Sequence, residues 1–247
     1  MKKRSYLLMT TIAVLLSGGA SAAEESVFAK ANQAYSKARF QEAVEGYESL
    51  VQSGQWNANL FYDLGNAYYR LGNFGKAILN YERALALDPR HPEADANLRL
   101  ARDEARALEL RKDWIERYAS MATVKQYSIA AAIAFWSAVF IVTHLVLSHR
   151  RSAGRMALVA LSIIVCAVSV FAIFTLENGT HGNALAVVTV KEIEARLATA
   201  DNAKSILLLP AGSEITILSE RGDWIYAALP NDRRGWIPAS SAERVRL

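Results

Sequence analysis

The longest features in the pattern of hydrophobic and polar positions are two runs without a formally charged residue. They cover residues 128–148 and 156–176, and each is 21 residues long. A helix of that length measures about 30 Å, which matches the hydrocarbon core of a bilayer. A buried core hairpin, the alternative, needs a larger protein around it than 247 residues supply. The pattern therefore predicts two transmembrane helices.

A third apolar stretch, residues 6–16, lies close to the N-terminus. Three basic residues at positions 2–4 precede it, and the small residues 20–22 follow it. This order is typical of a secretory signal peptide, which we predict over residues 1–22. An uncleaved N-terminal anchor is the alternative, and both versions export the chain that follows.

The segment between the two runs, residues 149–155, indicates how the hairpin is oriented. It contains Arg150, Arg151 and Arg155 and no acidic residue, and short basic loops stay on the cytoplasmic side of a membrane. The chain before and after the hairpin then faces the opposite side, as the export signal independently requires. We therefore expect an inner (plasma) membrane protein with two spans and with its N- and C-terminal domains on the periplasmic side.

Residues 24–112 contain a repeat with a period of 34. The period aligns Val27 with Phe61, Ala31 with Gly65, Asn32 with Asn66, Tyr35 with Tyr69, Phe40 with Phe74, Ala43 with Ala77 and Tyr47 with Tyr81. The second copy resembles the tetratricopeptide repeat, which has this period, at Leu64, Gly65, Tyr68, Gly72, Ala77, Tyr81, Ala84 and Pro89. The small residues Gly65 and Ala77 are expected where two antiparallel helices approach closely.

A capping helix is expected after the second copy. From Pro92 the chain is rich in Ala, Leu, Glu and Arg, and one apolar stripe comprises Ala94, Leu98, Ala101, Ala105 and Leu108. Two repeats and a cap are fewer than the three repeats that usually close such a core. We therefore predict that this module, residues 24–112, leans on another protein or on the membrane. A juxtamembrane helix over residues 113–127 is expected to connect it to the first span.

The first helix of each repeat carries candidates for partner recognition. The candidate protein-binding residues are Asn32, Tyr35, Tyr62, Asn66, Tyr69 and Arg70. The i, i+3 spacing of Asn66 and Tyr69 places an amide and a phenol on one side of the helix, and Arg70 adds a cation for a partner's carboxylate. Such a surface suits a partner's extended tail or helix. The alternative is that these residues brace neighbouring helices, because they also belong to the ordinary repeat pattern.

Beyond residue 178 the pattern changes to short apolar runs separated by turns. Five strands are expected, over residues 186–190, 205–210, 214–220, 223–229 and 235–240. The string GDWIYAALPNDRRGWIP resembles the end of a bacterial SH3-like domain, which implies a small all-β SH3-like barrel over residues 184–247. Where that family often has a V-R-x-G-P-S loop, residues 194–199 keep the arginine and lack the Gly-Pro. Trp224 and Trp236 are candidates for lining a ligand groove, and core packing is the alternative.

Composition and charge argue against several classes of function. Lys+Arg 28 against Asp+Glu 24 gives a net charge of +4, but the basic residues form no aromatic-laced face for nucleic acid. A single cysteine, Cys166, and four histidines without ligand spacing provide no framework for a metal site or a disulfide. The sequence holds no Walker, GxGxxG, GxSxG or HExxH motif. We expect no cofactor, no nucleic-acid partner and no enzymatic activity.

The order of these parts resembles the BatE-type proteins of Bat aerotolerance operons. The expected fold class is a multidomain membrane protein with an α-helical tetratricopeptide module, two transmembrane helices and a small all-β SH3-like barrel. The resemblance implies a membrane-anchored scaffold that works beside von Willebrand factor A-type Bat proteins and a MoxR-type ATPase in aerotolerance or envelope stress. A second hypothesis is that the SH3-like domain binds or senses peptidoglycan in the cell wall.

Overall fold

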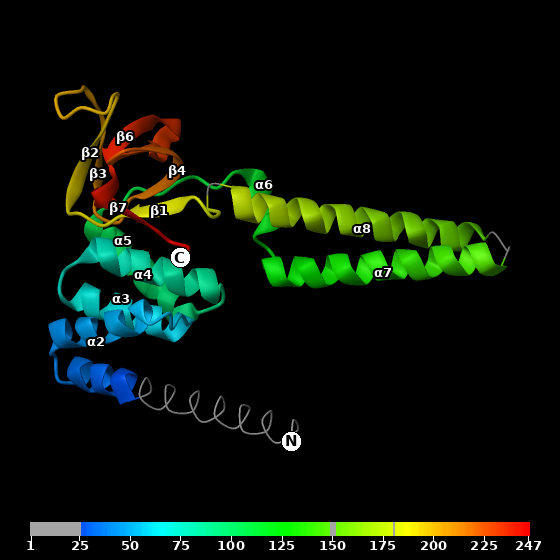
Figure 1. Cartoon of the computed structure of the whole chain (residues 1–247), viewed down its shortest axis with the longest axis horizontal. Coiled ribbons are helices and arrows are strands. Elements are labelled where there is room, and N and C mark those ends of the chain that lie inside the picture. Colours follow the sequence, from blue (N-terminus) through cyan, green and yellow to red (C-terminus); the bar gives the residue numbers. More distant parts are fainter. Residues whose placement is uncertain (1–25, 149–151, 180) are drawn as a thin grey trace, which may run out of the picture.

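The computed structural model of the chain describes residues 26–148, 152–179 and 181–247. The predicted signal peptide, Arg150 and Arg151 lie outside these residues. Figure 1 shows the three parts of the described chain: a group of short helices, a β domain beside them, and a long helical hairpin that projects to one side.

The N-terminal part forms the predicted helical repeat module. Its helices cover residues 26–36, α2 (Phe40–Gln52), α3 (Ala58–Arg70), α4 (Phe74–Leu87) and α5 (Pro92–Ala105). Asn57 and Asn73 begin α3 and α4, because their side chains accept hydrogen bonds from backbone N–H groups in the first turn of each helix. From α2 onward each helix packs on the next, so α5 covers α4 as the predicted cap.

The close contact predicted between the two helices of the second repeat is confirmed. Gly65 and Ala77 are both buried, and a β-carbon placed on Gly65 would lie 2.7 Å from the ring of Tyr81. A larger residue would therefore displace the ring. Gly72, with a φ of +72°, forms the tight turn between α3 and α4, in a conformation that strains other residues.

Two helices are long and apolar enough to cross a membrane. They are α7 (Val124–Ser148, mean hydropathy 2.2) and α8 (Ala153–Asn178, mean hydropathy 2.9), and they pack against each other. Few of their residues are buried, so the core-hairpin alternative is not supported. α8 begins inside the segment predicted as the loop, and the predicted juxtamembrane helix is divided into α6 (Trp114–Ala119), a turn and the start of α7.

The C-terminal β domain, residues 185–247, is a single antiparallel sheet. Its strands are β1 (Leu185–Val188), β2 (Glu192–Arg196), β3 (Ser205–Pro210), β4 (Glu214–Arg221), β5 (Trp224–Ala228), β6 (Arg234–Pro238) and β7 (Ala242–Arg244). They lie in the order β3-β2-β6-β5-β4-β1-β7. The five predicted strands are present, with slightly different bounds. The sequence did not predict β2 and β7, and β2 occupies part of the segment interpreted as a departure from the family's loop.

The capping helix ends earlier than its apolar stripe predicted. Arg106 takes a left-handed conformation, with a φ of +53°, and ends α5. Leu108 is therefore outside the helix, and the prediction for this residue was wrong. Its N–H donates to Ser213 Oγ at 3.1 Å, and its carbonyl accepts from Glu214 N–H at 2.9 Å. The chain after α5 thus binds the β domain.

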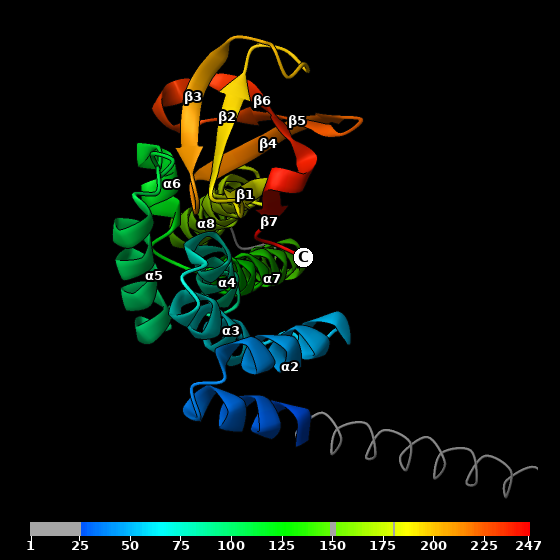
Figure 2. The same cartoon turned by 90° about the vertical axis from the view of Figure 1, so that its left-hand side faces the viewer.

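The β domain docks on the second helix of the second repeat. Figures 1 and 2 show the sheet lying over α4 and α5, and β1 packs directly against α4. A β-carbon placed on Gly75 of α4 would lie 2.8 Å from the carbonyl oxygen of Val188. The residues of the β domain that share one buried core with the repeat module are Leu185, Val187 and Val245.

This docking supplies the support that two repeats and a cap lack. The sequence predicted another protein or the membrane in that role, whereas the structure places the chain's own β domain there. Because the two parts share a core, we refer to the repeat module and the β domain together as the docked unit.

Candidate functional site

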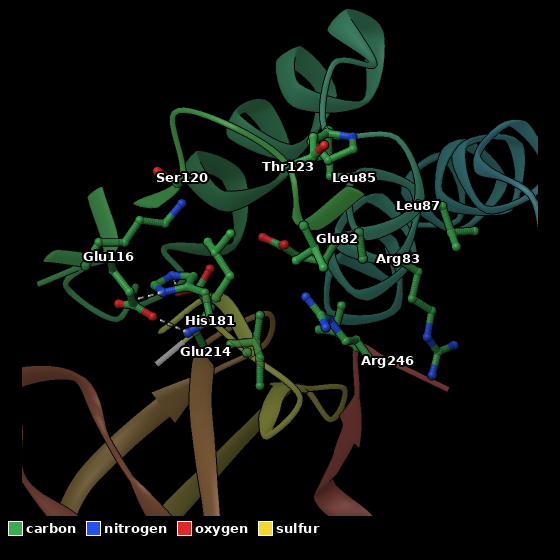
Figure 3. A pocket seen from close by; sticks show the side chains of 18 of the residues that line it. Glu82, Arg83, Leu85, Leu87, Glu116, Ser120, Thr123, His181, Glu214 and Arg246 are labelled. Atoms are coloured by element: carbon green, nitrogen blue, oxygen red, sulfur yellow. Dashed lines mark hydrogen bonds and ion pairs between the residues drawn. The ribbon is translucent and has the colours of Figure 1, made fainter. Parts of the chain in front are cut away.

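A cavity of about 1150 Å³ lies where the repeat module, the β domain and the hairpin meet (Figure 3). Its walls come from α4, α5 and α6, from the adjoining ends of α7 and α8, and from β1 and β4. Charged side chains of both signs line it, among them Glu82, Arg102, Lys112, Glu116, Glu214 and Arg246. This site has no local signal in the sequence, because each wall belongs to a different segment of the chain.

Arg102 of α5 joins the repeat module to the β domain through buried ion pairs. Its guanidinium contacts the carboxylates of Glu82 on α4 and Glu214 on β4. The side chain of Glu214 is 1% exposed, and those of Glu82 and Arg102 are 13% and 14% exposed. A buried charge is costly unless it is paired, so each of these groups depends on the others.

Glu214 also binds the chain on both sides of the hairpin. Its Oε2 accepts a hydrogen bond from the N–H of Leu110 at 3.0 Å and lies 3.3 Å from Nε2 of His181. The backbone N–H of His181 donates to Oε1 of Glu116 on α6 at 3.1 Å. Figure 3 shows His181 between the two carboxylates. The chain that enters α6 and the chain that leaves α8 are thus tied to one carboxylate of β4.

The environment shifts the pKa values of two of these carboxyl groups in opposite directions. Burial raises the pKa of Glu82, and the nearby charge of Arg102 offsets this only in part. Burial would also raise the pKa of Glu214, but the hydrogen bond with His181 and the charge of Arg102 hold it below its usual range. Glu214 is therefore the carboxylate that the network keeps ionised.

The arrangement suits a structural joint between three parts of the chain. The carboxylates in it are bound by an arginine, a histidine and backbone N–H groups. Within residues 26–148, 152–179 and 181–247, no group of three or more His, Cys, Asp or Glu residues could hold a metal ion.

Two of the predicted protein-binding residues make equivalent contacts in the two repeats. Tyr47 donates to Oδ1 of Asn32 at 2.6 Å, and Tyr81, one period later, donates to Oδ1 of Asn66 at 2.8 Å. Asn97 of α5 donates to the same oxygen of Asn66 at 2.8 Å. Both asparagines therefore brace the helices of their own repeats, whatever further contacts they make.

The remaining predicted residues present rings and a cation on the same helices. The rings of Tyr35 and Phe40 lie 5.3 Å apart, and those of Tyr69 and Phe74 lie 5.5 Å apart. The guanidinium of Arg70 lies 5.1 Å from the centre of the Phe40 ring, so it reaches from the second repeat to the first. Tyr35, Tyr62 and Tyr69 are half-buried and Arg70 is exposed. Within the described chain, the hydroxyls of Tyr35 and Tyr69 form no hydrogen bond.

The structure adds Asp63 and His91 to this face. The ring of His91 lies 4.9 Å from that of Tyr62. Burial raises the pKa of Asp63 to about 6, although His91 draws it downward. Asp63 is half-buried and forms no ion pair with any residue that the structure describes. The sequence signal was available, because the equivalent position of the first copy is Ala29 and the acid is specific to the second.

The two tryptophans proposed for a ligand groove differ in their surroundings. Trp236 lies beside Tyr226 on the neighbouring strand, with ring centres 5.0 Å apart, and beside Arg196 on the other side. Because directly paired residues share one face of a sheet, these three side chains form a row across it. Trp224 pairs with Pro238. Both tryptophans are half-buried.

Comparison with known proteins identifies the repeat. The family model described as tetratricopeptide repeat matches residues 58–91. The tetratricopeptide domain of Arabidopsis OM64 is similar at 20% identity and a TM-score of 0.32, covering 57% of this chain and 93% of that chain. The C-terminal SH3 domain of myosin IB from Entamoeba histolytica is similar at 26% identity and a TM-score of 0.16, covering 22% of this chain and 88% of that chain. No curated protein matches the chain. The protein therefore contains a tetratricopeptide repeat, within a chain that also carries two candidate membrane helices and an antiparallel β domain.

Proposed function

We propose that the protein is an inner-membrane scaffold or adaptor. It presents the repeat module and an SH3-like domain on the periplasmic side, where they bind other membrane or periplasmic proteins. The tetratricopeptide repeat and two helices long and apolar enough to serve as an anchor support this proposal. The resemblance to BatE-type proteins supports a place in an aerotolerance or envelope-stress complex, with von Willebrand factor A-type Bat proteins as partners.

The observation that carries the proposal is the side of the repeat module on which the β domain docks. The β domain packs on α4 and on the chain after α5, where it completes the core. The predicted protein-binding residues lie on the first helices of the repeats, over residues 26–36 and α3. Figures 1 and 2 show the helix over residues 26–36 at the far side of the module from the sheet. Docking therefore leaves this face available to a partner.

The chemistry of this face suits a partner segment with polar groups. The hydroxyls of Tyr35 and Tyr69 offer hydrogen bonds, and Arg70 offers a positive charge to a carboxylate. Asp63 offers a carboxyl group whose pKa burial raises to about 6, because His91 offsets the effect of burial only in part. A partner that brings complementary charges to Asp63 and Arg70 would satisfy both groups.

We expect the triple variant Tyr35→Phe/Tyr69→Phe/Arg70→Gln to lose its partner. Each change removes a recognition group but keeps most of the packing volume, and Asn66 stays intact because it braces Tyr81 and Asn97. The measurement is photo-crosslinking of the full-length membrane protein in cells, with partners identified by mass spectrometry. The amount of partner crosslinked to the triple variant should fall, while the thermal unfolding temperature of the variant stays that of the parent.

The matched control is Arg90→Gln, which removes an exposed arginine from the connection between α4 and α5. It should crosslink as the parent does. Undiminished crosslinking in a folded triple variant would place partner binding on another surface.

The proposed topology gives a separate prediction. Alkaline phosphatase fused after Arg111 or after Leu247 should be active, because both positions are expected outside the cytoplasm. A fusion within residues 150–155 should be inactive. An inactive fusion after Leu247 would overturn the two-span orientation.

A second candidate function is binding of peptidoglycan by the SH3-like domain. The observation that favours it is the row of Arg196, Trp236 and Tyr226, which gives the sheet two aromatic rings and a cation on one face. Co-sedimentation of the intact protein with purified peptidoglycan, compared between the parent and Trp236→Ala, distinguishes this candidate from the scaffold.

A further inference from the structure

α6 has two chemically distinct faces. Glu116 and Ala119 are buried, whereas Trp114 is 66% exposed and Tyr118 is 67% exposed. With about 100° between successive residues of a helix, Trp114 and Tyr118 project away from Glu116 and Ala119. Arg117 is exposed beside them and also lines the cavity. Met121, in the turn that follows, is 78% exposed. A six-residue helix thus exposes two large aromatic rings and an arginine together.

Contacts on the buried face fix the direction in which the aromatic face points. α6 packs against α8, and Glu116 accepts a hydrogen bond from the backbone N–H of His181 just beyond the end of α8. The side chain of Glu116 also fills the space beside Gly179 where a β-carbon would lie. Rotation of α6 would break these contacts, so the exposure of Trp114 and Tyr118 is a fixed feature.

The position of α6 along the hairpin is equally defined. Figure 1 shows α6 beside the end of α8 that adjoins the docked unit, and only residues 120–123 separate it from α7. Arg111, Lys112, Arg117 and Lys125 surround it in sequence and are exposed. None of the four forms an ion pair with another described residue. Aromatic rings and unpaired cations at the end of an apolar hairpin are the side chains that membrane interfaces favour.

We propose that α6 lies in the headgroup region of the bilayer leaflet next to the docked unit and binds anionic phospholipid there. The rings of Trp114 and Tyr118 enter the interface, and Arg117 and Lys125 contact lipid phosphates. The inference rests on the membrane anchoring in the proposed function. It adds that α6, as well as the two membrane helices α7 and α8, holds the docked unit against the bilayer surface.

Fluorescence quenching of the intact protein reconstituted into phospholipid vesicles tests this arrangement. Subtracting the spectrum of Trp114→Phe from that of the parent isolates the signal of Trp114. Phospholipids that are spin-labelled near the headgroup should quench this signal, whereas iodide in the aqueous phase should not. In vesicles of phosphatidylcholine alone the quenching by lipid should be weaker than in vesicles that also contain phosphatidylglycerol. Arg117→Gln/Lys125→Gln should remove that difference between the two kinds of vesicle.

Two other tryptophans provide matched controls. Trp56, exposed on the repeat module, should be quenched by iodide. Trp136, exposed on α7, should be quenched by lipid labelled deeper in the chain. If Trp136 responds to lipid while Trp114 responds only to iodide, the membrane anchor stands and the proposal for α6 is wrong. If neither responds to lipid, the anchoring itself fails and the proposal for α6 falls with it.

Discussion

Replacing Arg102 by methionine is expected to destabilise the docked unit by about 3–5 kcal/mol, the usual cost of removing one partner from a buried ion pair. Methionine keeps the apolar stem of the side chain but leaves Glu214 and Glu82 without their shared cation. Because the side chain of Glu214 is almost fully buried, loss of the guanidinium leaves its charge with less compensation for burial. The loss in free energy of unfolding is measured by urea denaturation of the full-length protein in detergent, monitored by circular dichroism.

Arg99→Met is the matched control for this variant. Arg99 lies one turn earlier on α5 and pairs with Asp95 at 2.6 Å, but both side chains are well exposed. An exposed pair of this kind contributes less than about 1 kcal/mol. Adding Glu214→Gln to Arg102→Met should restore part of the lost stability, because it removes the unpaired charge. Equal effects of Arg102→Met and Arg99→Met would contradict the role given to the buried network.

Gly75→Leu is expected to separate the β domain from the repeat module. A β-carbon at this position would lie 2.8 Å and 2.9 Å from the carbonyl oxygens of Val188 and Thr189, and backbone atoms of a paired strand cannot move aside as a flexible side chain can. Overpacking costs roughly 1–3 kcal/mol, and losing the shared core adds to this. Limited proteolysis should then cut the chain between α5 and α6, and thermal unfolding should show two transitions where the parent shows one.

Gly154→Leu is the control for the size of the new side chain. A β-carbon on Gly154 meets nothing closer than Ser152 Oγ at 3.9 Å, so the docked unit should unfold as in the parent. If Gly75→Leu behaves as Gly154→Leu does, the contact between α4 and β1 does not hold the two parts together.

The parts of the fold that the sequence predicted are those with a local signal. The repeat could be predicted because Gly65 and Ala77 mark the close approach of two helices and recur within a fixed period. β2 was missed although its Glu-Ile-Glu-Ala alternation places Ile193 and Ala195 toward the core and the acids outward, because the segment was compared with a family loop. β7 is three residues long, too short for any pattern, and it forms because β1 supplies a partner.

The site could not be predicted to the same extent, because it arises from long-range contacts. Glu82, Arg102, Glu214 and His181 resemble ordinary surface residues in the sequence, and only the docking of the β domain buries them together. On the first helices of the two repeats, the recurrence of Asn32 as Asn66 is visible in the sequence. Whether an amide braces its own helices or faces a partner depends on Tyr47 and Tyr81, fifteen positions away in each repeat, and the pattern left both alternatives open.

The hairpin interrupts a unit that is continuous in space. The buried core of the repeat module includes Leu185, Val187 and Val245, which are synthesised only after both apolar helices. During translation the repeat module therefore lacks the β domain that covers part of its core. It stays in this state until α7, α8 and the last strand have left the ribosome. A ribosome that stops within the hairpin would leave a repeat module lacking its cover, exposed to proteases and holdase chaperones. Completion of the fold thus requires that the whole hairpin has already been synthesised.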